Sequence, residues 1–219
     1  IIVLKNNKGT EDNRVRKLDY SIQMSKIFYE RFIKGADITL FSPHDVPGLY
    51  EAFGTSKFDA LYKKYEKDTS VPKKTIQART LIGDVLKERA ETGRIYIMNI
   101  DHANEHSSFV DTVRMSNLCQ EITLPTDPLQ HIDGKGEIAL CILSAINVGV
   151  IKDIKELETL CDLSVRGLEQ IIDHQKYPVK AAELSTKARR SLGIGYIGLA
   201  HYLAKNKVMY NDKEAWQLV

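Results

Sequence analysis

The stretch Ser116–Ile122 carries three side chains that together could bind and activate a small polar molecule. It reads SNLCQEI and supplies an amide at Asn117, a thiol at Cys119 and a carboxylic acid at Glu121. In an extended strand the side chains alternate between two faces, so these three would share one face, about 7 Å apart. Because buried polar groups need partners, a plain core strand would not carry this face. The pattern indicates a polar site or, more simply, a solvent-exposed edge strand, and alternation alone names no reaction.

The three cysteines, Cys119, Cys141 and Cys161, show no spacing typical of a zinc site or of a C-x-x-C redox pair. An odd number of cysteines in a chain without a signal peptide favours a reducing, cytoplasmic setting. On the residues alone, Cys141 is best interpreted as a small buried hydrophobe. Cys161 lies on the apolar side of a predicted helix, and we expect it to be structural.

Two further motifs suggest sites that the sequence does not support. The glycines at 193, 195 and 198 match a dinucleotide-binding pattern, but no clear strand precedes them and no acidic residue closes a βαβ unit. We therefore expect them to serve packing. His102, Asn104 and His106 could suggest a metal site, but without an accompanying acidic and cysteine set they are better interpreted as loop residues. We predict no metal site.

Composition excludes several classes of protein. The 219 residues are 43% hydrophobic, and 31 basic side chains oppose 29 acidic ones, which gives a net charge of +2. A nucleic-acid-binding protein usually shows a basic excess, so we expect no nucleic-acid partner. No stretch is long and apolar enough for a bilayer, and Ile1–Leu4 lacks the features of a signal peptide. The chain starts with Ile and ends in Trp216–Val219 as an apolar pattern begins, so we expect both ends to be cuts within a longer polypeptide.

Hydrophobic spacing predicts helices alternating with strands, which indicates an α/β protein. We see no repeat, no linker and no domain boundary, so residues 1–219 are predicted to be a single fragment of one domain. Within the helix predicted over residues 153–174, the inward residues are expected to be Leu157, Leu160, Leu163, Leu168 and Ile171. The predicted helices cover residues 13–34, 47–53, 57–65, 74–91, 153–174, 181–190 and 199–205. The predicted extended segments cover 38–41, 94–100, 115–124 and 137–143, with a polar loop over 101–111.

The stretch Ser116–Ile122 resembles the active-site finger of the large subunits of ribonucleotide reductases. Further matches to that family follow in the same order along nearly the whole chain, and an ordered set is far more specific than one motif. They are Asn6–Gly9, Asn13–Arg16, Leu40–Leu49, Thr92–Ile97, Asp101–His102, Gly136–Cys141 and Arg190–Gly195. The chain thus resembles the middle of the catalytic barrel domain of a class I enzyme.

This resemblance implies a role for each matching site residue. Cys119 would become a transient thiyl radical that abstracts the 3′ hydrogen of the substrate ribose. Glu121 would take the proton of the 3′ hydroxyl as general base. Asn117 would hydrogen-bond the ribose hydroxyls, and Ser116 would also contact the substrate. Cys141 would be one of two cysteines that supply reducing equivalents and become a disulfide, its partner lying in an earlier part of the family that this chain lacks.

The resemblance also implies fold and partners. The fold would be part of a ten-stranded α/β barrel, incomplete in this chain, with the finger loop at its centre. The chain itself would bind no cofactor. A small subunit containing metal would supply the radical, and allosteric nucleotides would bind outside this fragment. Other partners would be the ribonucleotide substrate, the rest of the large subunit and thioredoxin or glutaredoxin as reductant, with a homodimer formed by the complete subunit.

The implied function is reduction of ribonucleoside diphosphates to deoxyribonucleotides for DNA synthesis, and we expect the isolated fragment to be inactive. Two alternatives stay open at this point. The fragment could contribute only folding and subunit contacts, or it could belong to a cobalamin-dependent class II reductase, which shares the finger. The match near residues 13–20 favours class I.

Overall fold

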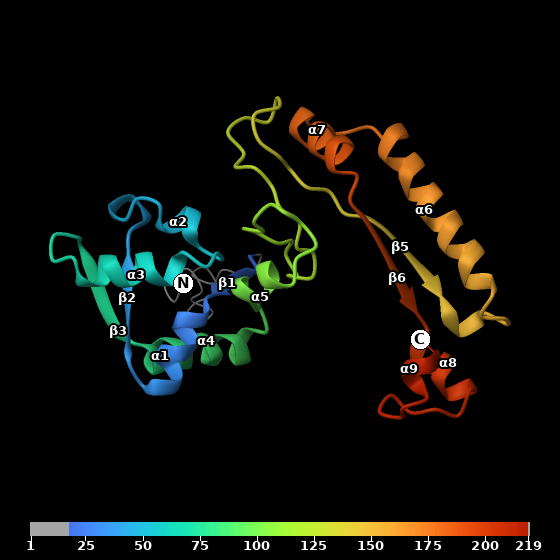
Figure 1. Ribbon diagram of the computed structural model, residues 1–219, viewed down its shortest axis with the longest axis horizontal. Helices are drawn as coiled ribbons and strands as arrows, with labels where there is room; N and C mark the ends of the chain where they lie inside the picture. The colour runs from blue at the N-terminus through green and yellow to red at the C-terminus, as the bar shows by residue number, and fades with distance from the viewer. Residues whose placement is uncertain (1–17, 219) are drawn as a thin grey trace, which may run out of the picture. The chain divides into compact units, whose positions relative to one another are not determined.

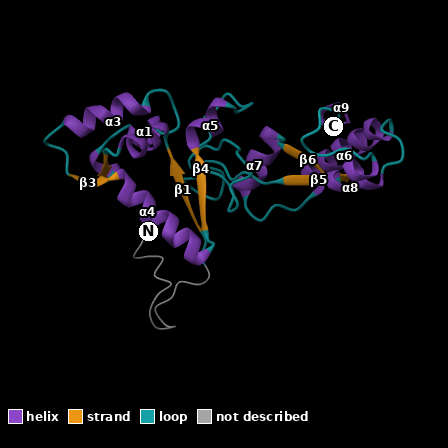
Figure 2. Ribbon diagram, turned by 90° about the horizontal axis from the view of Figure 1, so that it is seen from below, coloured by secondary structure: helices purple, strands orange, loops and turns teal. Residues whose placement is uncertain are grey.

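The computed structural model describes residues 18–218, in which helices and strands are mixed (Figures 1 and 2). The chain divides into two compact units, Ile1–Thr126 and Asp127–Val219. Each unit contains a parallel pair of strands joined by helical connections, the arrangement expected of an α/β protein. The two units are described separately below.

The first unit is organised around strands β1 (Tyr20–Met24) and β4 (Ile95–Asn99). They pair in parallel, with Tyr20 opposite Ile95 and Met24 opposite Asn99. Parallel strands need a crossover connection, and the chain between them includes helices α1 (Lys26–Lys34) and α4 (Ala78–Thr92), which contact each other. The carboxyl ends of both strands therefore lie at one edge of the sheet.

A second layer of this unit is the antiparallel pair β2 (Asp37–Phe41) and β3 (Lys73–Gln77). Between these strands the chain forms the short helices η2 (Pro43–Asp45) and α2 (Leu49–Ala52) and the longer α3 (Phe58–Lys67). Tyr62 of α3 fixes the layer to β2, since its hydroxyl donates to the Thr39 carbonyl at 2.8 Å and accepts from the Thr39 N–H at 2.7 Å. The buried core here comprises Ile27, Ile38, Val46, Leu49, Ala52, Phe58, Tyr62 and Ala78.

The second unit is built on strands β5 (Ile142–Asn147) and β6 (Leu192–Ile197), which also pair in parallel. Helices α6 (Glu156–His174) and α7 (Lys180–Arg189) form the crossover, and α6 packs on the pair through Leu168 and Ile172. The remaining helices of the described part of this unit are η3 (Val148–Val150), α8 (Leu199–Lys205) and α9 (Ala215–Leu218).

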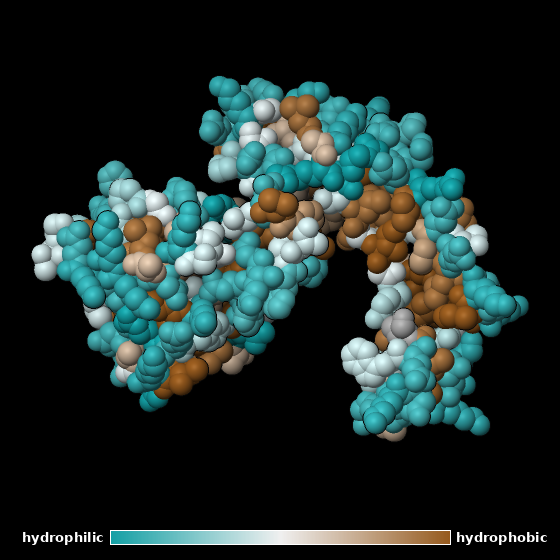
Figure 3. All heavy atoms as spheres, in the orientation of Figure 1, coloured by the Kyte–Doolittle hydropathy of each residue, from teal (hydrophilic) through white to brown (hydrophobic). Residues whose placement is uncertain are grey.

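Much of the strand pair in the second unit is uncovered. Leu143 on β5 and Tyr196 on β6 are each 56% exposed, and Ile197 is 54% exposed. Figure 3 shows apolar side chains gathered over β5 and β6. Parallel sheets are normally covered on both faces, and an isolated pair of strands is only marginally stable. This pair therefore has the character of part of a larger sheet.

Most of the predicted elements are confirmed, but five expectations are wrong. The helix predicted over 13–34 holds only from Lys26, because Tyr20–Met24 is strand β1, and residues 13–17 lie outside the described part. The helix predicted over 74–91 begins at Ala78, since Lys73–Gln77 pairs with β2. The loop predicted over 101–111 begins as helix α5 (Ile100–Glu105).

The fourth correction concerns the strand predicted over 137–143. Strand β5 begins only at Ile142, and residues 137–140 are half-buried coil. The fifth concerns the inward face of α6, because Leu163 is 59% exposed and Ile171 is 47% exposed, whereas Leu168 is buried. Among the described residues, no helix combines the length and the apolar character that a membrane crossing demands.

Candidate functional site

The stretch Ser116–Ile122 forms a tight turn in the structure, so the predicted extended strand is wrong here. No strand is assigned between residues 115 and 124. Gln120 has a φ of 68°, in the left-handed region, and its N–H donates to the Asn117 carbonyl at 3.2 Å. A left-handed residue reverses the chain, so the alternation of faces expected of Asn117, Cys119 and Glu121 is lost. Cys119 lies at the tip of this turn.

Two polar side chains close the base of the turn. The Asn117 side-chain oxygen Oδ1 accepts the N–H of Ile122 at 3.0 Å. The Ser116 hydroxyl donates to the carbonyl of the same residue at 2.6 Å. Because Ser116 and Asn117 satisfy backbone groups on the far side of the loop, they hold the turn shut as an alternative to strand pairing. The two residues expected to contact a substrate are thus also the ones that shape the loop.

The segment that leads into the turn is fixed to the rest of the first unit. Asn104 of α5 binds the backbone of fully buried Val113 twice, and the Arg114 guanidinium donates to the carbonyls of Tyr50 and Glu51 at 3.2 and 2.9 Å. In addition, the Gln23 side chain of β1 donates to the Arg114 carbonyl at 2.7 Å. The loop therefore has a rigid base and an exposed tip.

The Cys119 thiol is exposed, and the hydroxyl of Tyr96 on β4 donates a hydrogen bond to its sulfur. This hydrogen bond is the first cause of a raised pKa at Tyr96, and the Cys119 charge adds to the shift. The carboxylates of Asp19 and Glu121 raise that pKa further. A thiol, a phenol and a carboxylic acid thus come together at the tip of the turn.

Tyr96 was missed in the sequence, although a signal for it was present. It sits between the apolar residues Ile95 and Ile97 of β4, and alternation turns its side chain to the face opposite theirs. A phenol on a strand of otherwise apolar residues marks a position where a polar group must find a partner. That partner, Cys119, is 23 positions away along the printed chain and could not be identified from spacing.

Cys141 belongs to the second unit and is also an exposed, free thiol, directly before β5. The segment before it is firmly held. Gly136 has a φ of 98°, and a Cβ there would lie 2.2 Å from the Pro128 carbonyl oxygen, so only glycine fits. The Glu137 carboxylate receives hydrogen bonds from the Arg189 guanidinium at 2.9 and 2.7 Å and from the Asp127 N–H at 2.8 Å.

These contacts affect the titration of Glu137. The Arg189 hydrogen bonds hold the pKa of Glu137 below its ordinary value, and the Asp127 N–H acts in the same direction. One residue further on, the Ile138 carbonyl accepts the Ser185 hydroxyl at 2.5 Å. The approach to Cys141 is therefore fixed to helix α7 by an ion pair and a hydrogen bond.

The glycines of the 193–198 pattern serve packing. Gly193 and Gly195 lie within β6, and a Cβ on Gly193 would come within 2.5 Å of the Leu143 side chain on the paired strand. Gly198 precedes α8 with a φ of 78°. A dinucleotide fingerprint requires the glycines in a turn between a strand and a helix, which is not their position here.

The histidines once considered for a metal lie on or beside α5, where the rings of His102 and His106 meet edge to face at 6.3 Å. Within residues 18–218, no three His, Cys, Asp or Glu side chains gather as a metal site would require. Asn104, the polar residue between them, is used for the structural contact with Val113.

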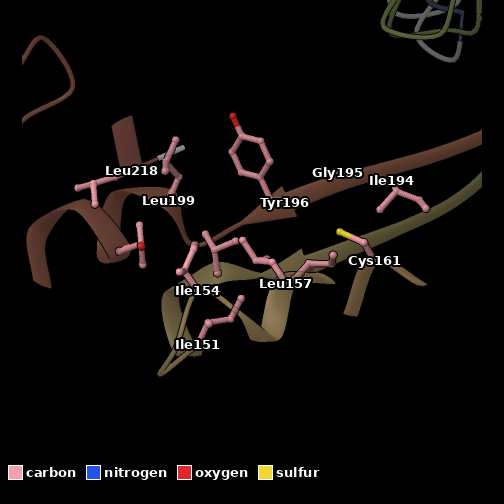
Figure 4. A pocket seen from close by; sticks show the side chains of 12 residues that line it. Ile151, Ile154, Leu157, Cys161, Ile194, Gly195, Tyr196, Leu199 and Leu218 are labelled. Atoms are coloured by element: carbon pink, nitrogen blue, oxygen red, sulfur yellow. The ribbon is translucent and has the colours of Figure 1, made fainter. Parts of the chain in front are cut away.

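Cys161 borders an apolar cavity of about 210 Å³ in the second unit (Figure 4). The cavity lies between η3, α6, β6 and the C-terminal helices, and its lining offers almost no polar chemistry. Its other lining residues are Ile146, Val148, Ile151, Ile154, Leu157, Ile194, Gly195, Tyr196, Leu199, Tyr202 and Leu218. Such a hollow is suited to receiving apolar side chains rather than a charged substrate.

Comparison with known proteins gives consistent matches over this whole chain. A family model described as "Ribonucleotide reductase, barrel domain" matches residues 1–219. The chain is 58% identical to the ribonucleoside-diphosphate reductase subunit alpha of Haemophilus influenzae, over 98% of this chain and 29% of that protein. It is 55% identical to the subunit alpha of Buchnera aphidicola from Schizaphis graminum, over 100% of this chain and 29% of the relative.

A third relative is the ribonucleoside-diphosphate reductase 1 subunit alpha of Escherichia coli. This chain is 53% identical to it, over 98% of the chain and 29% of the relative. The chain thus spans less than a third of the length of these curated relatives.

Proposed function

Since the chain belongs to the ribonucleotide reductase barrel-domain family, we propose that it forms the middle of the catalytic barrel of a ribonucleoside-diphosphate reductase large subunit. The whole enzyme would reduce ribonucleoside diphosphates to deoxyribonucleotides for DNA synthesis. The observation that carries this proposal is the exposed Cys119 thiol at the tip of a closed, anchored turn, with Glu121 two residues away.

In the proposed reaction the Cys119 sulfur, once it carries an unpaired electron, takes a hydrogen atom from the 3′ carbon of the ribose. Glu121 accepts the proton of the 3′ hydroxyl as general base, and the 2′ hydroxyl then leaves as water. Asn117 and Ser116 contact the ribose and hold it in register. A rigid loop base serves this chemistry, because a reacting atom must be held close to its target.

Cys141 would provide reducing equivalents as one of a pair of cysteines that become a disulfide. It is exposed and free, as such a thiol must be, and the ion pair of Glu137 with Arg189 fixes the segment before it. Its partner would come from a part of the large subunit outside this chain.

We propose that both units belong to one ten-stranded barrel domain, with no boundary within residues 1–219. The uncovered faces of β5 and β6 support this, as does a single family model over the whole chain. The remaining strands would come from other parts of the large subunit. They would also cover the apolar cavity beside Cys161.

The partners follow from this assignment. We expect a small subunit containing metal to supply the radical, and thioredoxin or glutaredoxin to reduce the disulfide. We also expect a homodimer of the complete subunit, a cytoplasmic location and nucleotide effectors bound outside this region. This chain itself would bind no cofactor. The names of the relatives, subunit alpha of a ribonucleoside-diphosphate reductase, favour this assignment over a cobalamin-dependent reductase and over a purely structural fragment.

The experiment that tests the proposal is Cys119→Ser in the full-length large subunit, assayed with the small subunit and a reductant. Cys161→Ser is the matched control, because Cys161 is also exposed but borders only the apolar cavity. We expect turnover to be lost in the first variant and retained in the second, with assembly unchanged in both. Retained turnover in Cys119→Ser would support the structural alternative. The fragment 1–219 alone should form no product.

A further inference from the structure

Because the finger is a turn, strand pairing does not hold the Cys119 side chain. The turn fixes the backbone through Asn117 and Gln120, but a cysteine side chain still has three staggered orientations around its Cα–Cβ bond. Only one of them aims the sulfur at a given point. The exposed tip therefore needs a second contact if the sulfur is to be held in place.

That contact comes from the adjacent strand. Tyr96 is in β4 opposite Ser21 of β1, so its backbone is fixed by a strand pair. The neighbouring residue Ile95 is 2% exposed, and Met98 on the same strand is 4% exposed, so the strand is anchored in the core. Tyr96 thus projects its hydroxyl from the most rigid part of the first unit onto the most exposed part of the finger.

We propose that Tyr96 is a positioning residue, whose hydroxyl holds the Cys119 sulfur in the orientation from which it reacts. This inference rests on the proposed function of Cys119. The hydroxyl donates to the sulfur, and the raised pKa of Tyr96 means that the phenol keeps its proton to do so. Glu121, which also affects Tyr96, lies on the same side of the turn tip. The phenol therefore sits beside both the sulfur and the proposed base without consuming the base's proton-accepting role.

The first test is Tyr96→Phe in the full-length large subunit, assayed with the small subunit and a reductant. This change removes one oxygen and keeps the ring. We expect kcat to fall about tenfold, which corresponds to about 1.4 kcal/mol. KM for the ribonucleotide should stay the same, because Tyr96 is not among the proposed substrate contacts. Tyr210→Phe is the matched control, since Tyr210 is 64% exposed in a loop, and its kcat should not change.

The second test does not depend on activity or on how well Tyr96→Phe folds. Ionisation of tyrosine is followed by ultraviolet absorbance in the full-length subunit and in its Cys119→Ala variant. Removal of the sulfur should lower the pKa of one tyrosine. The same comparison in a Tyr96→Phe background should abolish the difference and so assign it to Tyr96.

The outcomes separate the two proposals. If Cys119→Ser keeps its turnover, the proposed function fails, whatever Tyr96 does. If Cys119→Ser is inactive but Tyr96→Phe turns over at the wild-type rate, the positioning role is overturned and the function stands. A tyrosine titration that is the same with and without the Cys119 sulfur would overturn the positioning role as well. A rise in KM with kcat unchanged would assign Tyr96 to substrate binding and also contradict the inference.

Discussion

Asn104 holds the backbone of Val113 on both sides. Its Oδ1 accepts the Val113 N–H at 2.7 Å, and its Nδ2 donates to the Val113 carbonyl at 3.0 Å, as a paired strand would. Val113 is fully buried, so neither of these backbone groups has access to water. This pair is the base from which the finger with Cys119 extends.

Replacement of Asn104 by alanine should therefore destabilise the full-length subunit. The variant leaves a buried donor and a buried acceptor without partners, which costs roughly 1–3 kcal/mol. Asn206→Ala is the control, because its amide also bonds a carbonyl, that of Tyr202 at 2.9 Å, but on an exposed helix end. Urea unfolding should show a clear loss for the first variant and less than about 0.5 kcal/mol for the second. Equal losses would mean that the contact with Val113 does not stabilise the finger base.

Glu137 should make stability depend on pH. Its folded pKa lies below the ordinary value, so the Arg189 contact stabilises the fold above that ordinary value, about 4.3. The stabilisation is lost as the pH falls through the lowered pKa. At neutral pH, Glu137→Gln should lose roughly 1–2 kcal/mol. The difference from wild type should shrink in acid.

Thermal unfolding at several pH values checks this, with Asp162→Asn as control for an exposed ion pair with Arg166. The control should lose much less stability, because exposed pairs are screened by water. A difference between Glu137→Gln and wild type that grows in acid would contradict the assigned direction of the pKa shift.

Arg190 ends helix α7 in the left-handed conformation, with a φ of 46°, and pairs with Glu169 and Asp173 of α6. Alanine and glycine at 190 both remove these ion pairs, but only glycine adopts this conformation freely. Arg190→Gly should thus be more stable than Arg190→Ala, by about fivefold in the unfolding equilibrium constant. At Arg166, within α6, the order should reverse, because glycine is unfavourable inside a helix. The same order at both positions would refute the role of the backbone at 190.

Gln120 allows a similar test in the finger. Its φ of 68° suits glycine and is strongly unfavourable for a β-branched residue. Gln120→Gly in the full-length enzyme should keep most of its turnover, while Gln120→Val should lower kcat about tenfold by opening the turn at Cys119. Turnover measured with both variants at equal assembly decides the matter. A fully active valine variant would show that the turn is not needed.

The sequence was sufficient for the fold class and for most elements, because long amphipathic helices such as 153–174 carry a strong periodic signal. It failed where a short segment fits two periods. Residues Tyr20–Met24 continue a helical spacing and also alternate, and only the pairing with Ile95–Asn99 decides for a strand. Residues Lys73–Gln77 are likewise strand only because β2 lies beside them. Tertiary pairing overrides local pattern in both cases.

The candidate site was predictable in its residues but not in its shape. Ser116, Asn117, Cys119 and Glu121 were identified by their types and by the family resemblance. Their alternation suggested a strand, and a left-handed glutamine at 120 has no sequence signal that would predict a turn. The contacts of Asn104 with Val113 and of Tyr96 with Cys119 join distant segments, so no local pattern contains them.

The most direct test of the central claim follows the hydrogen atom itself. A ribonucleoside diphosphate with tritium on the 3′ carbon is incubated with the full-length large subunit, the small subunit and a reductant. We predict that tritium is released to water by the wild type and by Cys161→Ser, and that Cys119→Ser releases none. Tritium release by Cys119→Ser at the wild-type rate would show that another group attacks the sugar, and the assignment of Cys119 would be wrong.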